Sequence, residues 1–508
     1  MANPLYDTLL KPHSNNANVM FHAVGQNGNL IGDITFSEFV QHSAQCANAL
    51  TEAGLEPGDR VVAQIGKSVA SLALYCGCVQ SGVVYLPLNT AYTPAEVEYF
   101  VEDSGAKLLV CDPDSANPLN DIAKRHQIQL ETQASDGQTG SFIELVAAQA
   151  KTFATADRTD DDLAALLYTS GTTGRSKGAM LTQDNLLSNA VVLKDLWQFT
   201  TDDVLLHALP VFHTHGLFVA SNICLLAGAS MLFEPAFNTD RVIDLLPRAT
   251  SMMGVPTFYT RLLADDRFNK TLTSNMRVFI CGSAPLLAET HVQFEQTTGH
   301  RILERYGMTE TNMNTSNPYD GDRRAGTVGF PLPGVELKIT DPNTGKNLDA
   351  GEIGTIEVRG RNVFKGYWNM PEKTAEELRA NGFFITGDLG RLDDDYVTIV
   401  GRNKDLIISG GYNIYPKEIE LVLDEQPGVI ESAVIGVPHP DFGESVVGVL
   451  VGSESDIDAN ALQSAIDASL ARFKHPRKLV FVDSLPRNAM SKVQKNELRA
   501  QYKDLFLV

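Results

Sequence analysis

The sequence is poor in positive charge. It contains 41 Lys plus Arg against 62 Asp plus Glu, which gives a net charge of −21 at pH 7. A chain this acidic is a poor general binder of nucleic acid or anionic membrane, because long-range attraction to phosphate needs the opposite sign. We therefore expect neither as a partner, and any phosphate ligand must be held by a local site or by a metal ion.

Cysteine pairs and uninterrupted apolar runs are also missing. The six cysteines include no Cys-x-x-Cys pair, which predicts reduced, buried thiols in place of disulfides or a zinc site. Residues 68–95 carry no charge, but Gly77, Gly82, Pro87 and Asn89 break the stretch. We expect a buried helix followed by a buried strand there, with no membrane span, and hence a soluble, cytoplasmic protein.

The first third of the chain alternates helix and strand signals. A capping-box pattern at 35–38 and a proline after Thr93 open two of the expected helices. Short apolar strands are expected at 61–65, 83–87 and 107–111. Strands separated by helices predict a mainly parallel sheet covered on both faces. Residues 112–160 are polar and poorly periodic, which indicates a variable surface region.

The pattern changes after about residue 320. Segments 335–339 and 354–358 alternate apolar and polar residues, which predicts antiparallel strands. A break falls at 401–405, and the rest of the chain predicts a compact α+β unit. The fold class is therefore α/β with several domains. Layered α/β subdomains and a β-rich subdomain make up a large N-terminal part, followed by a small α+β domain.

The segment 168–178, Tyr-Thr-Ser-Gly-Thr-Thr-Gly-Arg-Ser-Lys-Gly, is the strongest chemical signal. Its glycines allow close backbone approach to phosphate oxygens, and its hydroxyl groups and Lys177 add donors and charge. It is not a Walker A loop, since Lys177 follows Ser176 and precedes Gly178. A flexible surface loop is the alternative. The residues expected to bind phosphate are Thr169, Ser170, Gly171, Thr172, Thr173, Gly174 and Lys177.

This segment resembles the AMP-binding signature of the acyl-adenylate-forming enzymes, which include the acyl-CoA synthetases. Further segments match in order at 306–310, at 386–388, and at 401–402 continuing to 416–420, and Pro486-Arg487 leading to Lys492 completes the set. The resemblance spans residues from about 30 to 500. It implies an N-terminal domain at 1–401, a hinge at 402–405 and a mobile C-terminal domain at 406–508.

The resemblance implies a two-step ligation. A carboxylate first attacks the α-phosphate of MgATP to give acyl-AMP and pyrophosphate, and the thiol of coenzyme A then displaces AMP. The implied cofactors are ATP, Mg²⁺ and coenzyme A. Two anions meet in the first step, so cations must offset their charge. By their matches, Lys492, Thr309 and Glu310 are the catalytic residues, and Glu310 also holds Mg²⁺, which prefers hard oxygen ligands.

Nucleotide binding follows from the same matches. Asp388 would accept hydrogen bonds from both ribose hydroxyls, Arg402 would contact ribose or phosphate, and Tyr306 would stack on adenine. The implied nucleotide-binding residues are Gly282, Ser283, Ala284, Pro285, Glu304, Arg305, Tyr306, Gly307, Met308, Thr309, Asp388 and Arg402.

The C-terminal part carries the implied hinge and coenzyme A site. Lys404 occupies the hinge position, and the implied coenzyme A contacts are Ser409, Gly410, Gly411, Arg472 and Arg477. For the basic stretch 472–478, a solvated face is the alternative. Two positions depart from the family pattern. Ser491 stands where glycine usually precedes the catalytic lysine, and the turn at 393–396 lacks its expected glycine, which puts the hairpin geometry in question.

Three residues bear on the choice of acid: His215, Arg261 and Ser283. A pocket for a fatty or aryl acid should be apolar, because burying an unpaired arginine is costly. An arginine with a hydroxyl and an imidazole instead suits a second carboxylate. The alternative for Arg261 is a surface ion pair with Asp265, one helical turn away.

Segments 213–216, 255–261, 281–284 and 304–316 resemble those of the family's malonate-activating branch. The implied substrate is malonate, with methylmalonate or another short carboxylic or dicarboxylic acid as the alternative. A non-catalytic nucleotide-binding protein on the same scaffold is the alternative from a different class, and the intact Lys492 argues against it. The expected partners are these small molecules, and a homo-oligomer is compatible with the sequence.

Overall fold

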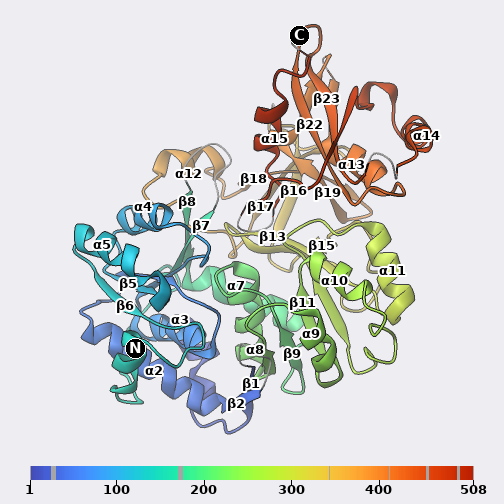
Figure 1. Cartoon of the computed structure of the whole chain (residues 1–508). Coiled ribbons are helices and arrows are strands. Elements are labelled where there is room, and N and C mark those ends of the chain that lie inside the picture. The colour runs from blue at the N-terminus through green and yellow to red at the C-terminus, as the bar shows by residue number, and fades with distance from the viewer. Residues whose placement is uncertain are drawn as a thin grey trace. The chain divides into compact units, whose positions relative to one another are not determined.

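The computed structural model describes residues 2–24, 30–169, 176–342, 344–410, 412–453, 457–488 and 492–506. Its contacts divide the chain into two compact units. Unit 1 comprises Met1–Glu336 and Val358–Phe384, and unit 2 comprises Leu337–Glu357 and Ile385–Val508. The chain, coloured from blue to red, is drawn in Figure 1.

The first sheet of unit 1 has the strand order β6-β5-β3-β4-β7-β8. Its neighbours pair in parallel except β7 with β8, as the alternating helix and strand signals predicted. The strands are β3 (Arg60–Gln64), β4 (Val84–Pro87), β5 (Leu108–Cys111), β6 (Gln129–Thr132), β7 (Leu163–Thr169) and β8 (Lys177–Thr182).

Helices cover both faces of the first sheet, because successive side chains of a strand point to opposite faces. On one face Val62 and Leu109 pack with residues of α4 (Pro94–Ser104) and α5 (Ala116–His126). On the other, Tyr85 of β4 contacts Tyr75 of α3 (Val69–Ser81), and α2 (Phe36–Glu52) packs on α3 (Figure 1). The fold class expected from the sequence is confirmed.

The uncharged stretch at 68–95 forms a buried helix, α3, and then a buried strand, β4, as predicted. In the described ranges, no helix is long and apolar enough to cross a membrane. All six cysteines are buried free thiols, as expected.

The region 112–160 is mostly exposed or half-buried, as expected of a surface region, but it contains more regular structure than its sequence predicts. Its variability stays a prediction. It contains α5, β6 and α6 (Ser141–Ala147), and β6 extends the first sheet. Phe142 and Val146 of α6 are buried. The elements are short and expose much of their surface, so few apolar residues reveal them.

The second sheet of unit 1 has the strand order β15-β14-β13-β12-β11-β9-β10-β1-β2. The strands from β13 to β1 run parallel, whereas β2, β14 and β15 pair antiparallel. The strands are β1 (Val19–Val24), β2 (Leu30–Thr35), β9 (Val204–His207), β10 (Ser230–Phe233), β11 (Ser251–Gly254), β12 (Val278–Cys281), β13 (Leu303–Met308), β14 (Asn312–Ser316) and β15 (Phe330–Pro331).

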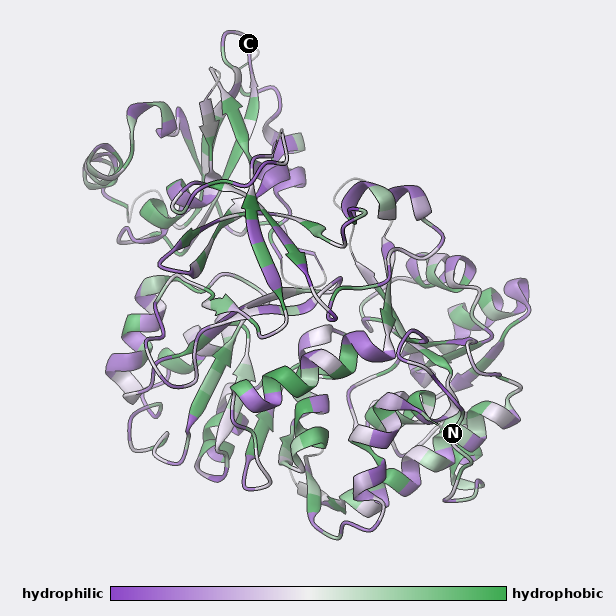
Figure 2. Cartoon of the chain, turned by 180° about the vertical axis from the view of Figure 1, so that it is seen from behind, coloured by the Kyte–Doolittle hydropathy of each residue, from purple (hydrophilic) through white to green (hydrophobic). Residues whose placement is uncertain are grey.

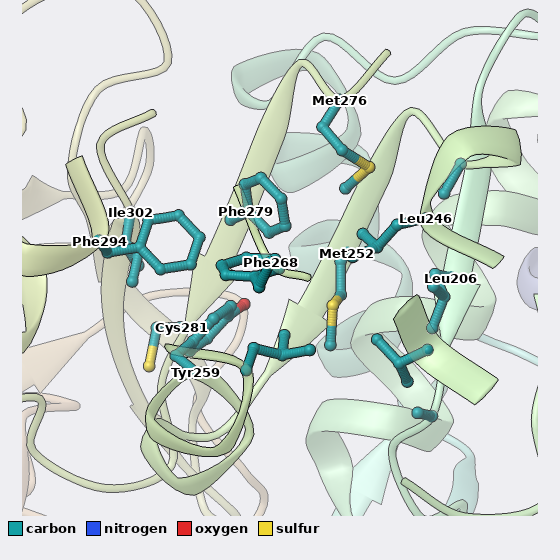
Figure 3. Packing of buried hydrophobic residues seen from close by; sticks show 14 of the residues in the cluster. Leu206, Leu246, Met252, Tyr259, Phe268, Met276, Phe279, Cys281, Phe294 and Ile302 are labelled. Atoms are coloured by element: carbon teal, nitrogen blue, oxygen red, sulfur yellow. The ribbon is translucent and has the colours of Figure 1, made fainter. Parts of the chain in front are cut away.

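Figure 3 shows the core on one face of the second sheet, where Met252 and Phe279 meet Tyr259, Phe268 and Phe294. Tyr259 lies on α10 (Pro256–Leu263) and Phe294 on α11 (Ala288–Thr298), so these helices close that face. The remaining helices of unit 1 are α1 (Pro4–Leu9), α7 (Gln183–Leu196), the π-helix η3 (His215–Ala220), α8 (Ser221–Ala227), α9 (Thr239–Leu245) and α12 (Pro371–Glu377).

Unit 2 contains two sheets. One has the order β16-β17-β18-β19, and the other has the order β21-β20-β23-β22 with β24 beside β23. The sheet that contains β22 and β23 packs one of its faces on α13 and α14 and its opposite face on α15. The elements are β16 (Glu336–Thr340), β17 (Gly354–Arg359), β18 (Phe384–Asp393), β19 (Tyr396–Arg402), β20 (Ile407–Ser409), β21 (Tyr412–Ile414), α13 (Pro416–Asp424), β22 (Glu431–His439), β23 (Gly443–Val451), α14 (Ala459–Ser469), β24 (Lys478–Val482) and α15 (Lys495–Tyr502).

The helices and strands expected after residue 401 are thus present. In Figure 2 the central strands are coloured mainly as hydrophobic, and many helices have one hydrophobic and one hydrophilic side. This is the pattern expected of sheets covered by amphipathic helices.

Candidate active site

Three of the segments expected to bind acid or nucleotide lie at one edge of the second sheet. β11 leads into α10, which carries Arg261, and β12 leads into Gly282–Pro285. Residues 304–308 form most of the neighbouring strand, β13. Because the carboxyl ends of parallel strands meet at the same edge, the fold brings these segments together there.

Ser283 and His215, two of the expected acid-binding residues, contact each other. The Ser283 hydroxyl lies 3.3 Å from His215 Nδ1. Ser283 has φ +72°, a left-handed conformation that non-glycine residues adopt rarely and often at functional sites. Burial, and next the charge of Arg305, hold the pKa of His215 well below its usual value, so its imidazole is neutral.

The sequence predicted Arg305 only as part of the nucleotide motif, yet its side chain has the most unusual surroundings of the site. The residue is 3 % exposed, and its Nε and Nη2 have no hydrogen-bond partner in the described part of the chain. Burial lowers the pKa of Arg305 to about 10, so the guanidinium stays charged at neutral pH. A Cβ at Gly282 would lie 2.4 Å from Arg305 Nη1, so any side chain there would force the guanidinium to shift.

The HTHG segment at 213–216 needs its glycine for a similar reason. A Cβ at Gly216 would lie 2.0 Å from the carbonyl oxygen of Pro210. The carbonyl of Gly216 contacts His207 Nε2 at 3.0 Å, and Lys67 Nζ lies 2.8 Å from His207 Nδ1. This buried Lys67–His207 pair braces the start of η3. No motif signalled it, because Lys67 follows β3 of the first sheet and His207 ends β9 of the second.

Arg261 is exposed on α10. The alternative ion pair with Asp265 is absent from the described structure, where Arg267 Nη2 lies 2.7 Å from Asp265 Oδ2 instead. The role of Arg261 toward an acid stays a prediction.

The expected phosphate-binding residues are described only in part. Thr169 and Lys177 are register partners at the ends of β7 and β8. Lys177 Nζ lies 3.3 Å from Glu377 Oε1 and 4.1 Å from the ring centroid of Tyr367. The other predicted members, Ser170, Gly171, Thr172, Thr173 and Gly174, lie outside the described residues.

Glu310, the expected metal ligand, is buried and connected to Lys177. The Tyr367 hydroxyl, which has one proton to donate, lies 2.6 Å from Glu377 Oε2 and 3.0 Å from Glu310 Oε1. One carboxylate beside bound phosphates suits Mg²⁺, which keeps several of its waters and takes few protein ligands. No cluster of three or more metal-ligating side chains occurs in the described ranges. Tyr367 and Glu377 carried no signal in the sequence.

Among the other residues of the nucleotide motifs, one makes a structural contact and the rest are at least partly accessible to solvent. Glu304 Oε1 lies 3.0 Å from Nδ1 of His291, a residue of α11, so this side chain makes a structural contact. Burial raises the pKa of Glu304. Tyr306, Gly307, Met308 and Thr309 are half-buried, and Ser283, Ala284 and Pro285 are exposed.

In unit 2, Asp388 and Arg402 face each other across β18 and β19. Arg402 Nε lies 2.6 Å from Asp388 Oδ1, and the backbone N–H of Asp388 donates to Thr386 Oγ1. The hairpin forms without the expected glycine, because Asp394 and Asp395 adopt φ of 48° and 66°. Asp tolerates this turn better than most residues.

The expected hinge and catalytic lysines are both exposed in unit 2. Lys404 lies in a 3₁₀ turn, Asn403–Asp405. The backbone N–H of Lys492 donates to Asn488 Oδ1 at 2.9 Å. Ser491, which replaces the usual glycine, lies outside the described residues.

Two of the expected coenzyme A contacts meet at Phe442. The backbone N–H of Gly410 donates to the Phe442 carbonyl at 2.9 Å, and the Arg477 guanidinium lies 4.1 Å from the Phe442 ring centroid. Ser409 ends β20, and Arg472 is exposed. Gly411 lies outside the described residues.

The chain belongs to the AMP-binding enzyme family. The model of the AMP-binding enzyme matches residues 19–368, and that of the AMP-binding enzyme C-terminal domain matches residues 418–492. The chain is an acid–thiol ligase of this family, and ATP and coenzyme A are its cosubstrates.

Individual relatives are similar over most of their length. A malonate–CoA ligase of Arabidopsis thaliana is 36% identical over 82% of this chain and 74% of the relative. A feruloyl-CoA synthase of an Amycolatopsis species is 35% identical over 92% of this chain and 94% of the relative. The crystal structure of ATP-bound MatB from Rhodopseudomonas palustris is 55% identical, covers 100% of both chains and superposes with a TM-score of 0.95.

Proposed function

We propose that the chain is a malonate–CoA ligase, which converts ATP, malonate and coenzyme A to malonyl-CoA, AMP and diphosphate through malonyl-AMP. Relatives of nearly equal identity are ligases of malonate and of ferulate. Overall similarity therefore leaves the acid open, and the residues of the pocket must select it.

The buried Arg305 is the observation that carries this proposal. A buried cation with unmatched donors costs free energy unless a ligand supplies the opposite charge. A carboxylate accepts two parallel N–H bonds from a guanidinium, and the Nε and Nη2 of Arg305 are the unpartnered groups. Ser283 and His215 would form hydrogen bonds beside this carboxylate. The exposed Arg261 would lie nearer the entrance of the acid-binding site. Malonate keeps one free carboxylate while the other reacts, whereas ferulate would bring an aromatic ring.

In the first step, one malonate carboxylate oxygen attacks the α-phosphorus and the bond to pyrophosphate breaks. Lys492 would bridge the carboxylate and the α-phosphate, and Lys177 would bind the departing phosphates. Glu310 would hold Mg²⁺, which neutralises phosphate charge when it is bound. Asp388 and Arg402 would hold the ribose.

In the second step, the sulfur of coenzyme A attacks the carbonyl carbon of malonyl-AMP, the thiol loses its proton and AMP leaves. The C-terminal domain, 406–508, would turn about the hinge 402–405 between the steps, removing Lys492. Ser409, Gly410, Gly411, Arg472 and Arg477 would then contact coenzyme A. Arginines suit its phosphates.

A panel of acids tests the proposal. AMP and pyrophosphate are quantified with malonate, methylmalonate, succinate, acetate, octanoate and ferulate. Malonate should give the highest kcat/KM, and AMP instead of ADP should accumulate. Acetate, octanoate or ferulate exceeding malonate would overturn the choice of acid, and the absence of pyrophosphate release with every acid would favour a non-catalytic scaffold.

A further inference from the structure

A carboxylate that no motif predicted holds the lysine of the expected phosphate site. Glu377, the last residue of α12, lies with its two oxygens 3.3 and 3.4 Å from Lys177 Nζ. The side chains of Lys177 and Glu377 are only 19% and 23% exposed. The ion pair is therefore partly shielded from solvent and from screening by salt.

Glu377 has further partners that do not depend on Lys177. The Tyr367 hydroxyl lies 2.6 Å from its Oε2, and Lys373 Nζ lies 2.9 Å from its Oε1. If Lys177 moves away, the carboxylate keeps a hydrogen bond and a cation. The penalty for leaving a partly buried charge without a partner is thus avoided.

We propose that Glu377 is an internal competitor for the phosphates of ATP and for pyrophosphate. It holds Lys177 while the phosphate site is empty and releases it when a polyphosphate enters. The inference rests on the proposed role of Lys177 in phosphate binding. A lysine ammonium is a compact point charge, so a phosphate that takes up its N–H groups must displace the carboxylate.

The competition weakens the binding of substrate ATP and of product pyrophosphate alike. After adenylation the returning carboxylate helps to displace pyrophosphate. The opposite role is a brace, in which Glu377 positions Lys177 for phosphate and so strengthens binding. The two roles predict opposite signs when the charge of Glu377 is removed.

The test is calorimetric titration with inorganic pyrophosphate, and separately with ATP, in the presence of Mg²⁺ and without any acid. Glu377→Gln keeps the shape and the contact with Tyr367 but removes the charge. It should tighten both dissociation constants by roughly two- to five-fold, the range expected for an ion pair near the surface. The matched control is Glu372→Gln, which removes the same charge from the same helix. Glu372 is exposed near the start of α12, so binding should not change.

A double-mutant cycle completes the experiment. Lys177→Met should weaken pyrophosphate binding, and Glu377→Gln should have no further effect in that background. Weaker or unchanged binding by Glu377→Gln alone, or an equal change in Glu372→Gln, overturns the inference. Unchanged pyrophosphate binding in Lys177→Met would show that Lys177 does not bind phosphate. Glu377 could then not compete with phosphate for it. The choice of malonate is untouched by either result, because no acid is present.

Discussion

A buried guanidinium without a matching anion is costly to a folded protein, and among the residues that the structure describes Arg305 is such a group. A residue retained for binding at the expense of stability has a recognisable signature: its removal harms function and spares the fold. Arg277 provides the contrast, since its Nε and Nη2 lie 2.6 and 2.9 Å from the two oxygens of Asp203.

We expect Arg305→Met to leave the free energy of unfolding unchanged or to raise it, by up to about 4 kcal/mol. The matched variant Arg277→Met should lower it by about 3 kcal/mol, because Asp203 then loses its partner in a buried setting. Urea denaturation of both variants measures the difference. A loss in Arg305→Met as large as that in Arg277→Met would show that Arg305 has a structural partner.

His215 makes the stability depend on pH. Burial holds its pKa well below 6.5, so it stays neutral when folded, whereas the unfolded chain takes up a proton near pH 6.5. Its contribution is therefore fully present above that pH and is lost as the pH falls below it, by up to ~1.4 kcal/mol per pH unit.

Urea denaturation at pH 7.5 and 5.5 measures this effect. The wild type should lose about 1 kcal/mol more than His215→Gln between these pH values. An equal loss in both proteins would mean that His215 is protonated in the folded state.

Local motifs marked Lys177, Glu310, Asp388 and Lys492 in the sequence, and their roles stay predictions. Their surroundings could not be predicted, because the contacts join distant segments. Tyr367 and Glu310 are in contact although 57 residues separate them in the sequence, and Lys177 and Glu377 are in contact although 200 residues separate them. The direction of the Arg305 side chain likewise depends on how β13 pairs with β12.

At the scale of elements, the capping box of α2 was readable from the sequence alone. The Thr35 side chain accepts from the backbone N–H of Glu38, and the Glu38 carboxylate accepts from that of Thr35. We expect Thr35→Ala to lower the free energy of unfolding by about 1 kcal/mol, since it removes the helix cap.

Thr35→Ser is the control for that substitution, because it retains the hydroxyl and should stay within a few tenths of a kcal/mol of the wild type. Chemical denaturation compares them. No difference between the Ala and Ser variants would mean that the cap contributes nothing to the stability of unit 1.

Elements with strong periodicity or caps, such as α2, α3 and α4, agree with their sequence patterns. The sequence pattern missed α5, β6 and α6, which pack on the first sheet and on α2. The hairpin after β18 is a third case, in which Asp394 and Asp395 take the positions where glycine was expected.

At the scale of the whole molecule, the proposed mechanism requires the Lys492 ammonium at the reacting atoms in the first half-reaction and its removal from them in the second. Lys492→Ala should nearly abolish formation of malonyl-AMP, by about 100-fold or more, because the developing charge loses its partner. Attack of coenzyme A on supplied malonyl-AMP should be largely intact. Rapid-quench measurements of the two half-reactions separate these steps.

Equal damage to both half-reactions in Lys492→Ala would contradict alternation of the C-terminal domain. The boundary at 401 also stays a prediction. Contacts divide the chain so that β19 groups with unit 2, whereas the predicted hinge begins at the last residue of this strand. The division into two units reflects packing in one conformation, whereas a hinge is defined by the motion of one domain relative to the other.

The most direct test is the ratio of kcat/KM for malonate to that for propionate, which lacks the second carboxylate. In the wild type this ratio should be large, and in Arg305→Met it should fall by roughly 10- to 150-fold, the value of a hydrogen bond to a charged group. The KM for ATP should change little. A ratio that survives Arg305→Met unaltered would contradict the claim that this buried guanidinium selects the acid.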